Sequence, residues 1–163
     1  KRYTIGFLGS TREDGRKAFL NQLAQRYGNT LFQATETPST DDPVPQGRLS
    51  RDAYYRRLQQ CRVVLSLPGA GIDTFRFWEH TACNALHASP LVPLFIPGDF
   101  KNQHEIIRFE NLDQLCCNID RLMNGRQAVQ DVVRHGRFKL LNHHMTTHRA
   151  AYFLNCITKA FNC

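Results

Sequence analysis

The segment from Ser66 to Ala85, which reads SLPGAGIDTFRFWEHTACNA, holds the residues best suited to chemistry. It joins a short apolar strand to a helix through the glycine-rich turn Pro68–Gly71. A strand, a glycine loop and a helix N-terminus in series present backbone N–H groups to an anion. Within the predicted helix, Arg76 offers a guanidinium that matches phosphate, and Glu79 a carboxylate that can accept hydrogen bonds from sugar hydroxyls. The segment therefore predicts part of a nucleotide-sugar pocket.

Arg76 and Glu79 also have a simpler interpretation, because residues three apart on a helix can form an ion pair worth a few tenths of a kcal/mol. The predicted helix Thr74–Ala85 carries an apolar face with Glu79 at its edge. That face is expected to pack on the sheet through Phe75, Trp78, Ala82 and Ala85. A carboxylate beside a buried tryptophan needs a partner, because burial of an unpaired charge is costly. This favours a ligand-binding role for Glu79 over the ion pair.

The rest of the chain alternates short strands with helices. Strands are predicted over Tyr3–Leu8, Leu31–Ala34, Val63–Leu67, Leu91–Ile96 and Ile106–Phe109. Helices are predicted over Asp14–Arg26, Ser50–Gln60, Thr74–Ala85, Asn111–Asn124, Val129–Leu141 and onward from Thr146, with Ser50 and Asn111 as N-caps. The last helix is expected to bury Ala150, Phe153, Leu154, Ile157 and Phe161. This alternation predicts an α/β fold, a Rossmann-like parallel sheet flanked by helices.

Ligands of such sheets bind beyond the carboxyl ends of the strands. Three predicted loops lie there, at residues 9–16, 47–50 and 68–74, and all three carry glycine. The longest loop, residues 35–47, holds three prolines and two aspartates. Convergence of the three glycine-bearing loops strengthens the prediction of an anion site more than any single motif does.

Composition is consistent with one globular domain that has an anionic partner. The chain has 163 residues, 42% of them hydrophobic, and a formal net charge of +7 in which arginine greatly outnumbers lysine. The excess charge favours phosphate-bearing ligands, although a solvated basic surface would explain it equally well. The arginines are scattered rather than gathered in one stripe, which makes a nucleic-acid partner a minor alternative. No apolar stretch approaches the length of a membrane span.

The six cysteines show no metal-binding or CxxC spacing, so we expect free and mostly buried thiols. Free thiols are typical of a reducing compartment, which favours the cytoplasmic side. His143, His144 and His148 lack a carboxylate or cysteine at metal-ligand spacing and are expected at the surface or as helix caps. His80 lies on the helix that carries the site and could face the cleft, but the favoured interpretation is that it is exposed beside Glu79.

A tyrosine pair lies in the helix before the site strand. Tyr54 and Tyr55, followed by Arg56 and Arg57, could stack on bases. One core tyrosine beside a solvated basic edge is the favoured interpretation.

The run GAGIDTFRFWEHTACNA resembles the C-terminal half of glycosyltransferases of the GT-B fold, most closely the group 1 enzymes related to spore-maturation glycosyltransferases. Three further segments are similar to that half in the same order. These are FLGS at Phe7–Ser10, RLSRDAYYRRLQQCRVVLSL at Arg48–Leu67 and THRAAYFL at Thr147–Leu154. The resemblance covers nearly the whole chain, and its central motif is the most specific part.

The resemblance implies roles residue by residue. Glu79 matches the glutamate that holds the nucleotide ribose, and Arg76 matches the arginine of the same motif. The loop beside the donor diphosphate and sugar is implied to comprise Gly69, Ala70, Gly71, Asp73 and Thr74. Gly9 and Ser10 belong to the first strand and its loop, while Arg12 or Arg16 would add positive charge at the diphosphate. Arg48 and Leu49 would lie against the base.

No catalytic residue is identified, although Asp73 is a candidate. Asp73 could bond sugar hydroxyls or cap the following helix, and both readings stay open. Many relatives carry a glutamate eight positions before the ribose-binding one, where this chain has Gly71. After the helix, Asn84 replaces a residue that is usually glycine.

Residues 1–163 are therefore predicted to be a single nucleotide-sugar-binding domain, one half of a GT-B architecture and a fragment of a longer two-domain transferase. The expected ligand is a UDP or GDP sugar for hexosyl transfer, with no metal or other cofactor. Acceptor binding would belong to a missing N-terminal domain, so the isolated domain is expected to be weak or inactive. The alternatives are a polyanion-binding or nucleic-acid-binding module without catalysis, and a degenerate transferase domain retained for partner contacts.

Overall fold

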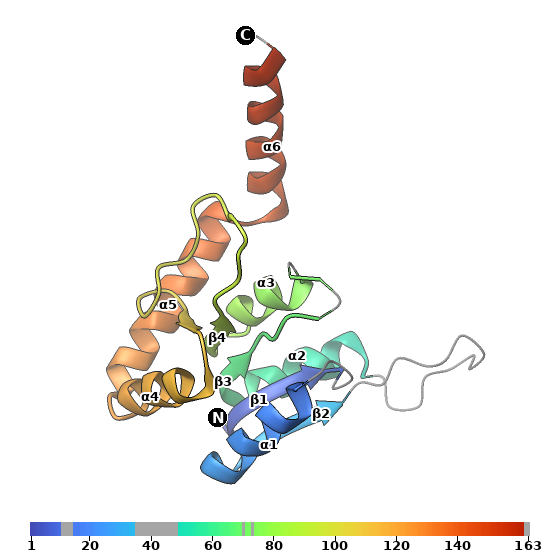
Figure 1. The fold of residues 1–163 in the computed structure, drawn as a ribbon. Helices are drawn as coiled ribbons and strands as arrows, with labels where there is room; N and C mark the ends of the chain where they lie inside the picture. Colours follow the sequence, from blue (N-terminus) through green and yellow to red (C-terminus); the bar gives the residue numbers. More distant parts are fainter. Residues whose placement is uncertain (11–14, 35–48, 70, 73, 162–163) are drawn as a thin grey trace, which may run out of the picture.

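The computed structural model describes residues 1–10, 15–34, 49–69, 71–72 and 74–161 (Figure 1). Several predicted features fall outside this range. They are Arg12, Arg48, Ala70, Asp73, Cys163 and the loop 35–47.

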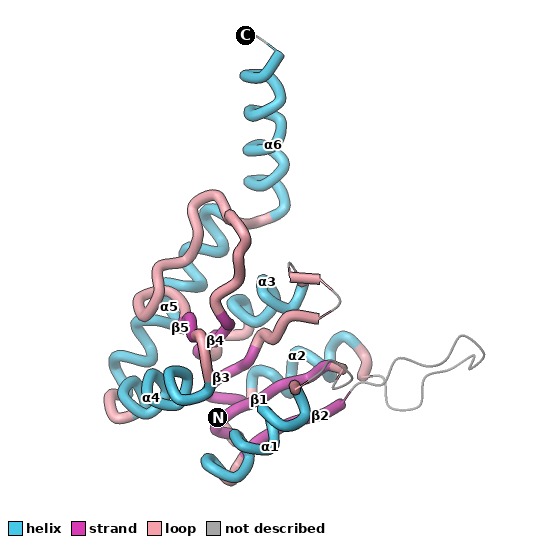
Figure 2. The backbone as a smooth tube through the Cα atoms, viewed as in Figure 1, coloured by secondary structure: helices cyan, strands magenta, loops and turns pink. Residues whose placement is uncertain are grey.

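The described residues form a five-stranded parallel sheet and six helices (Figures 1 and 2). The strands are β1 Tyr3–Gly9, β2 Thr30–Ala34, β3 Cys61–Leu65, β4 Leu86–Pro90 and β5 Ile107–Phe109. The helices are α1 Arg16–Tyr27, α2 Arg51–Gln59, α3 Phe75–Ala82, α4 Leu112–Met123, α5 Arg126–His143 and α6 Thr146–Phe161. The predicted α/β class with a Rossmann-like parallel sheet is confirmed.

Strand order places a topological switch between β1 and β3. The order is β2-β1-β3-β4-β5, so the chain adds β2 on one side of β1 and β3 on the other. Ile5 and Gly6 of β1 pair with Val63 and Val64 of β3, and all strands run in one direction. Ligands of open parallel sheets bind at this switch point, beyond the carboxyl ends of the two strands.

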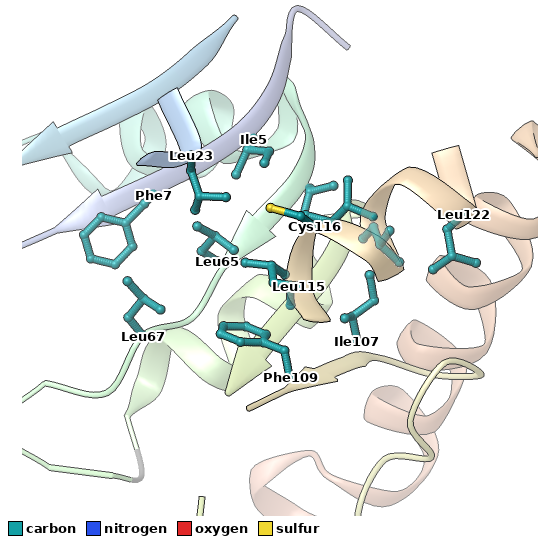
Figure 3. Close-up of a cluster of buried hydrophobic side chains, with 14 of the residues drawn as sticks. Ile5, Phe7, Leu23, Leu65, Leu67, Ile107, Phe109, Leu115, Cys116 and Leu122 are labelled. Atoms are coloured by element: carbon teal, nitrogen blue, oxygen red, sulfur yellow. The ribbon is translucent and has the colours of Figure 1, made fainter. Parts of the chain in front are cut away.

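A main hydrophobic core fills one face of the sheet. Phe7 of β1 and Leu65 of β3 meet Leu23 of α1 and Leu115 of α4 there (Figure 3). On the other face, Leu58 of α2 joins Leu8, Cys61 and Val64 in a smaller cluster. This two-sided burial fixes the sheet and therefore the positions of the loops at its carboxyl edge.

Two of the predicted helix caps are confirmed. Ser50 Oγ accepts from the Ala53 N–H at 3.2 Å, and Asn111 Oδ1 accepts from the Gln114 N–H at 2.9 Å. Gly28 ends α1 with a φ of 65°, a value that favours glycine. The capping chemistry of these residues is local, which is why the sequence alone could identify it.

The prediction of a strand over Leu91–Ile96 is wrong, because β4 lies earlier, at Leu86–Pro90. Leu91, Leu94 and Phe95 are exposed in a loop. The sequence LHASP does not look like a buried strand, yet His87 and Ser89 are buried. Thr81 Oγ1 lies 2.8 Å from His87 Nδ1, and Arg108 donates to Ser89. These partners offset part of the cost of burying polar side chains in β4, whereas His87 Nε2 is buried with no hydrogen-bond partner among the described residues.

The apolar face predicted for α3 is wrong at only two of its four residues, since Ala85 is buried and Trp78 is half-buried against a core cluster. Phe75 is 87% exposed and Ala82 is exposed, whereas Phe77, His80 and Thr81 are the buried residues of α3. The helix ends at Ala82 rather than at Ala85. Asn84 follows with a φ of 54°, in the left-handed region that asparagine tolerates.

The last helix differs from expectation in its surroundings. α6 extends away from the body of the domain (Figure 1), and none of its residues is buried. Phe153, Leu154 and Phe161 are 62%, 60% and 85% exposed, so the predicted burial of this apolar face is wrong. No helix among the described residues is long and apolar enough to cross a membrane.

Candidate functional site

Arg16 ties together the two loops at the switch point. Its guanidinium donates from Nη1 to the Ser10 carbonyl and from Nη2 to the Pro68 carbonyl, so it joins the loop after β1 to the loop after β3. The side chain is buried, and its guanidinium carbon lies 5.7 Å from the Phe7 ring centroid. By binding both carbonyls, Arg16 fixes the spacing of the two loops. A direct role of Arg16 at a diphosphate stays a prediction.

Arg76 brings a positive charge from α3 to the end of β1. A Cβ atom added to Gly9 would lie 3.0 Å from Arg76 Cζ and 3.0 Å from Phe7 Cζ. The guanidinium of the half-buried Arg76 thus packs on the backbone of the last residue of β1, and a side chain at position 9 would require it to shift by a few tenths of an ångström. The prediction that Gly9 and Arg76 share one site agrees with this placement.

Glu79 lies one turn further along α3 and is half-buried. Its Oε1 accepts a hydrogen bond of 2.7 Å from the hydroxyl of Tyr55 on α2. Among the ion pairs of the described residues, none joins Glu79 to Arg76. Glu79 therefore contacts Tyr55 of another helix rather than Arg76 of its own helix, and the sequence did not indicate this contact.

His80 is fully buried, which contradicts its predicted exposure. Its Nε2 lies 3.1 Å from the Tyr54 hydroxyl, and its ring meets His87 edge-to-face with centroids 5.8 Å apart. Burial, and secondarily the charge of Arg76, lowers the pKa of His80 to about 3. Burial, with smaller contributions from His80 and Arg108, also lowers the pKa of His87 well below its usual value. Both rings are therefore neutral at physiological pH.

The two tyrosines of α2 do not divide into a core residue and a solvated one. Tyr54 and Tyr55 are both half-buried, with ring centroids 5.4 Å apart in an edge-to-face arrangement. Each hydroxyl contacts a residue of α3, so stacking on bases is not needed to explain them. Two consecutive residues of α2 thus contact two consecutive residues of α3. The sequence alone did not indicate these pairs, because they depend on how α2 packs on α3.

The remaining predicted residues lie around the same edge of the sheet. The Gly69 N–H donates to the Gly71 carbonyl at 3.1 Å, in the loop between β3 and α3. Thr74 occupies the N-cap position of α3 without a hydrogen bond from its side chain. Leu49 is half-buried against the α2 cluster, and Ser10 follows β1.

Two hollows of the described residues lie at opposite edges of the sheet, one near the carboxyl ends of β3, β4 and β5 and one at the amino ends of the strands. A cavity of about 10 Å³, room for one water, is lined by Pro68, Thr74 and Arg108 among others. A larger hollow of about 760 Å³ lies at the amino ends of the strands, near Lys1, Arg62 and Arg134. Strand topology and the placement of Arg76 favour the carboxyl edge as the ligand site.

The histidines and cysteines that the structure describes supply no clustered metal ligands. In the part of the chain that the structure describes, no three of His, Cys, Asp and Glu gather closely enough to hold an ion. His144 is the C-cap of α5 and is buried, with Nε2 3.1 Å from the Gly98 carbonyl oxygen. Cys61, Cys83 and Cys116 are buried free thiols, whereas Cys117 and Cys156 are exposed free thiols.

Together the strand order, the glycine-bearing loops and the helix after β3 define a Rossmann-like domain of the kind that forms half of a GT-B enzyme. A solved structure agrees, the C-terminal domain of a glycosyl transferase group 1 family protein (LpcC) from Francisella tularensis. It is 12% identical, with a TM-score of 0.55, over 88% of this chain and 87% of that chain. No curated protein sequence matches this chain at a significant level.

The glycosyl transferase-like family model matches residues 12–155, which is most of the chain. The chain therefore belongs to the glycosyl transferase-like family, and its fold is that of a GT-B C-terminal domain.

Proposed function

We propose that this domain binds a nucleoside diphosphate sugar at the switch point between β1 and β3, as the donor half of a hexosyl-transferring enzyme. The observation that carries the proposal is that the Arg76 guanidinium packs against Gly9, the last residue of β1. A cation held against backbone at the carboxyl edge of a parallel sheet suits a diphosphate. Membership of the glycosyl transferase-like family supports a nucleotide sugar as the ligand.

Each described residue has a separate task in this proposal. Arg76 and the N-terminus of α3 stabilise the diphosphate charge, since both lie beside the loop after β3. Glu79 accepts hydrogen bonds from the ribose hydroxyls, and Leu49 lies toward the base. Arg16 keeps the two loops at the spacing that these contacts require.

Transfer itself would need a second, acceptor-binding domain. A single domain offers no closed site that excludes water and aligns donor with acceptor. The isolated chain should therefore bind the donor with little or no transfer. Binding should also need no divalent ion, because Arg76 and the α3 N-terminus offset the diphosphate charge, so EDTA should leave the affinity unchanged.

Calorimetric titration with UDP, GDP, ADP and dTDP, at about 50 and about 200 mM salt, tests the donor site. Selective binding of one diphosphate that persists at the higher salt is the expected result. Equal, weak binding of all four that disappears with salt would contradict the proposal, and would instead indicate a basic surface for polyanions.

The Glu79→Ala variant tests the role of the carboxylate. Removing a charged hydrogen-bond acceptor should weaken binding of the preferred diphosphate by about tenfold or more. The matched control is Glu110→Ala, an exposed glutamate that follows β5, at the far edge of the sheet from β1. Equal affinity of the Glu79→Ala variant and the unaltered domain would refute the role of Glu79.

A further inference from the structure

Two adjacent tyrosines of α2 contact two adjacent residues of α3. The Tyr55 hydroxyl donates to Glu79 Oε1 at 2.7 Å, and the Tyr54 hydroxyl lies 3.1 Å from His80 Nε2. One contact therefore reaches the half-buried carboxylate that faces a ligand in the proposed function. The other reaches a fully buried imidazole, away from solvent.

The Tyr55 contact restricts a side chain that is otherwise free to move. A glutamate on a helix surface samples several rotamers, and ordering it on ligand binding costs free energy. Tyr55 supplies the one hydrogen bond that the described residues make to Glu79. A carboxylate can accept about four hydrogen bonds, so a bond to Oε1 leaves Oε2 available to a ligand.

The Tyr55 ring is itself held in place. The Arg51 guanidinium carbon lies 5.9 Å from its centroid, and the Tyr54 ring packs on it edge-to-face. These contacts order the phenol before any ligand arrives, as preorganised sites require.

We propose that Tyr55 is a positioning residue, which orients the Glu79 carboxylate toward the 2′- and 3′-hydroxyls of a ribonucleoside diphosphate. The inference rests on the proposed donor site. It extends that proposal by assigning a positioning role to Tyr55, and with it a preference for ribose over sugars that lack these hydroxyls. An oriented carboxylate can meet both hydroxyls of the diol at once, whereas a mobile one must be ordered by the ligand.

A purely structural Tyr55 would behave differently. If its hydroxyl only stabilised the packing of α2 on α3, its loss would lower the affinity for every nucleotide equally or change only the stability of the domain. A positioning role affects only ligands that carry ribose hydroxyls. The ratio of affinities for a ribonucleotide and its 2′,3′-dideoxy form therefore separates the two roles.

The experiment uses the tightest binder among UDP, GDP and ADP, together with its 2′,3′-dideoxy counterpart. Both are titrated into the unaltered domain, Tyr55→Phe, Glu79→Ala and the double variant. Tyr55→Phe should lower the affinity for the ribonucleotide about five- to tenfold and leave the affinity for the dideoxy form unchanged. In the Glu79→Ala background, Tyr55→Phe should have no further effect, because the two side chains act as one unit.

Tyr54→Phe is the matched control, since it removes the neighbouring hydroxyl from the same pair of helices. It should lower the melting temperature, because it leaves His80 without its partner, and keep the ribose-to-dideoxy ratio unchanged. An equal change of the ratio in both tyrosine variants would overturn the inference.

The inference and the proposed function fail in different ways. If the unaltered domain prefers the ribonucleotide and Glu79→Ala abolishes that preference, the donor site stands. An unchanged ratio in Tyr55→Phe would then overturn the role of Tyr55 alone. If none of UDP, GDP, ADP and dTDP binds, the donor site fails and the role of Tyr55 fails with it. If one diphosphate binds selectively but its ribose and dideoxyribose forms bind equally, the donor site stands, and the ribose contact of Glu79 fails together with the role of Tyr55.

Discussion

Gly9 is the residue at which the site is most sensitive to a single methyl group. A Cβ there would lie 3.0 Å from both Arg76 Cζ and Phe7 Cζ. Phe7 is fully buried, so Arg76 is the side chain that can move. The contact explains why the end of β1 carries glycine.

Gly9→Ala should therefore shift the Arg76 guanidinium by a few tenths of an ångström and weaken diphosphate binding, but by less than Arg76→Ala, which removes the charge altogether. Calorimetry with the preferred diphosphate measures both variants. If Gly9→Ala binds as the unaltered domain does, Arg76 does not act from the position over β1.

The buried histidines make stability depend on pH. The pKa of His80 is lowered to about 3 in the folded domain, against about 6.5 in the unfolded chain. Between these values the unfolded state binds more protons, so stability falls as the pH drops below about 6.5. The loss continues until the pH reaches the folded pKa, and His87 adds to it in the same direction.

We expect urea unfolding to show a loss of about 1.4 kcal/mol per such histidine between pH 7.5 and pH 5.5. His80→Gln should reduce that loss, because one titrating group is removed, even if its stability at pH 7.5 is lower. His148→Gln, at an exposed position of α6, serves as the control. An identical loss in His80→Gln and the unaltered domain would show that His80 is not buried as a neutral ring.

At the scale of elements, α5 approaches the chain before β5 at one glycine. A Cβ on Gly136 would lie 2.2 Å from the Glu105 carbonyl oxygen, and that atom belongs to backbone rather than to a flexible side chain. Helix and loop would have to separate to admit even a methyl group. The glycine therefore sets how closely α5 packs.

Gly136→Ala should destabilise the domain by about 1–3 kcal/mol despite the higher helix propensity of alanine. Thermal unfolding measures the effect, and Gly28→Ala is a useful comparison. Gly28 has open space around it but a φ of 65°, so its cost arises from backbone strain instead. Increased stability of Gly136→Ala would mean that α5 lies further from Glu105.

For the whole molecule, α6 contributes little to the stability of the body. All of its residues are exposed, and a described contact with the body is the Arg149 guanidinium over the Trp78 ring at 4.6 Å. Such a cation–π contact is worth about 0.5–1 kcal/mol at an exposed site.

Removing residues 146–163 should therefore shift the melting temperature by only about 2–4 °C and leave the circular dichroism of the remaining domain intact. The same deletion should reduce self-association, because it removes the exposed Phe153, Leu154 and Phe161. Loss of cooperative unfolding in the shortened chain would contradict the exposed placement of α6.

The sequence by itself determined the class of the fold and the segment that holds the candidate site. Alternating apolar strands and helices, with caps at Ser50 and Asn111, are local features, so they predicted a parallel α/β sheet correctly. The Gly-rich turn with Arg76 and Glu79 is equally local, and it indicated the family that the comparisons show.

Only the tertiary structure decided which side chains are buried and what each one touches. β4 escaped prediction because His87 and Ser89 are polar side chains that are buried with partners from the flanking elements α3 and β5. The face of α3 was misassigned in part because His80, a polar residue, packs inward against Tyr54 while Phe75 points out. The apolar residues of α6 were expected to be buried but found no partner in the body. The hydrophobic pattern of a sequence predicts which side chains tend to be buried. Whether each one is buried depends on the neighbours that the fold places around it.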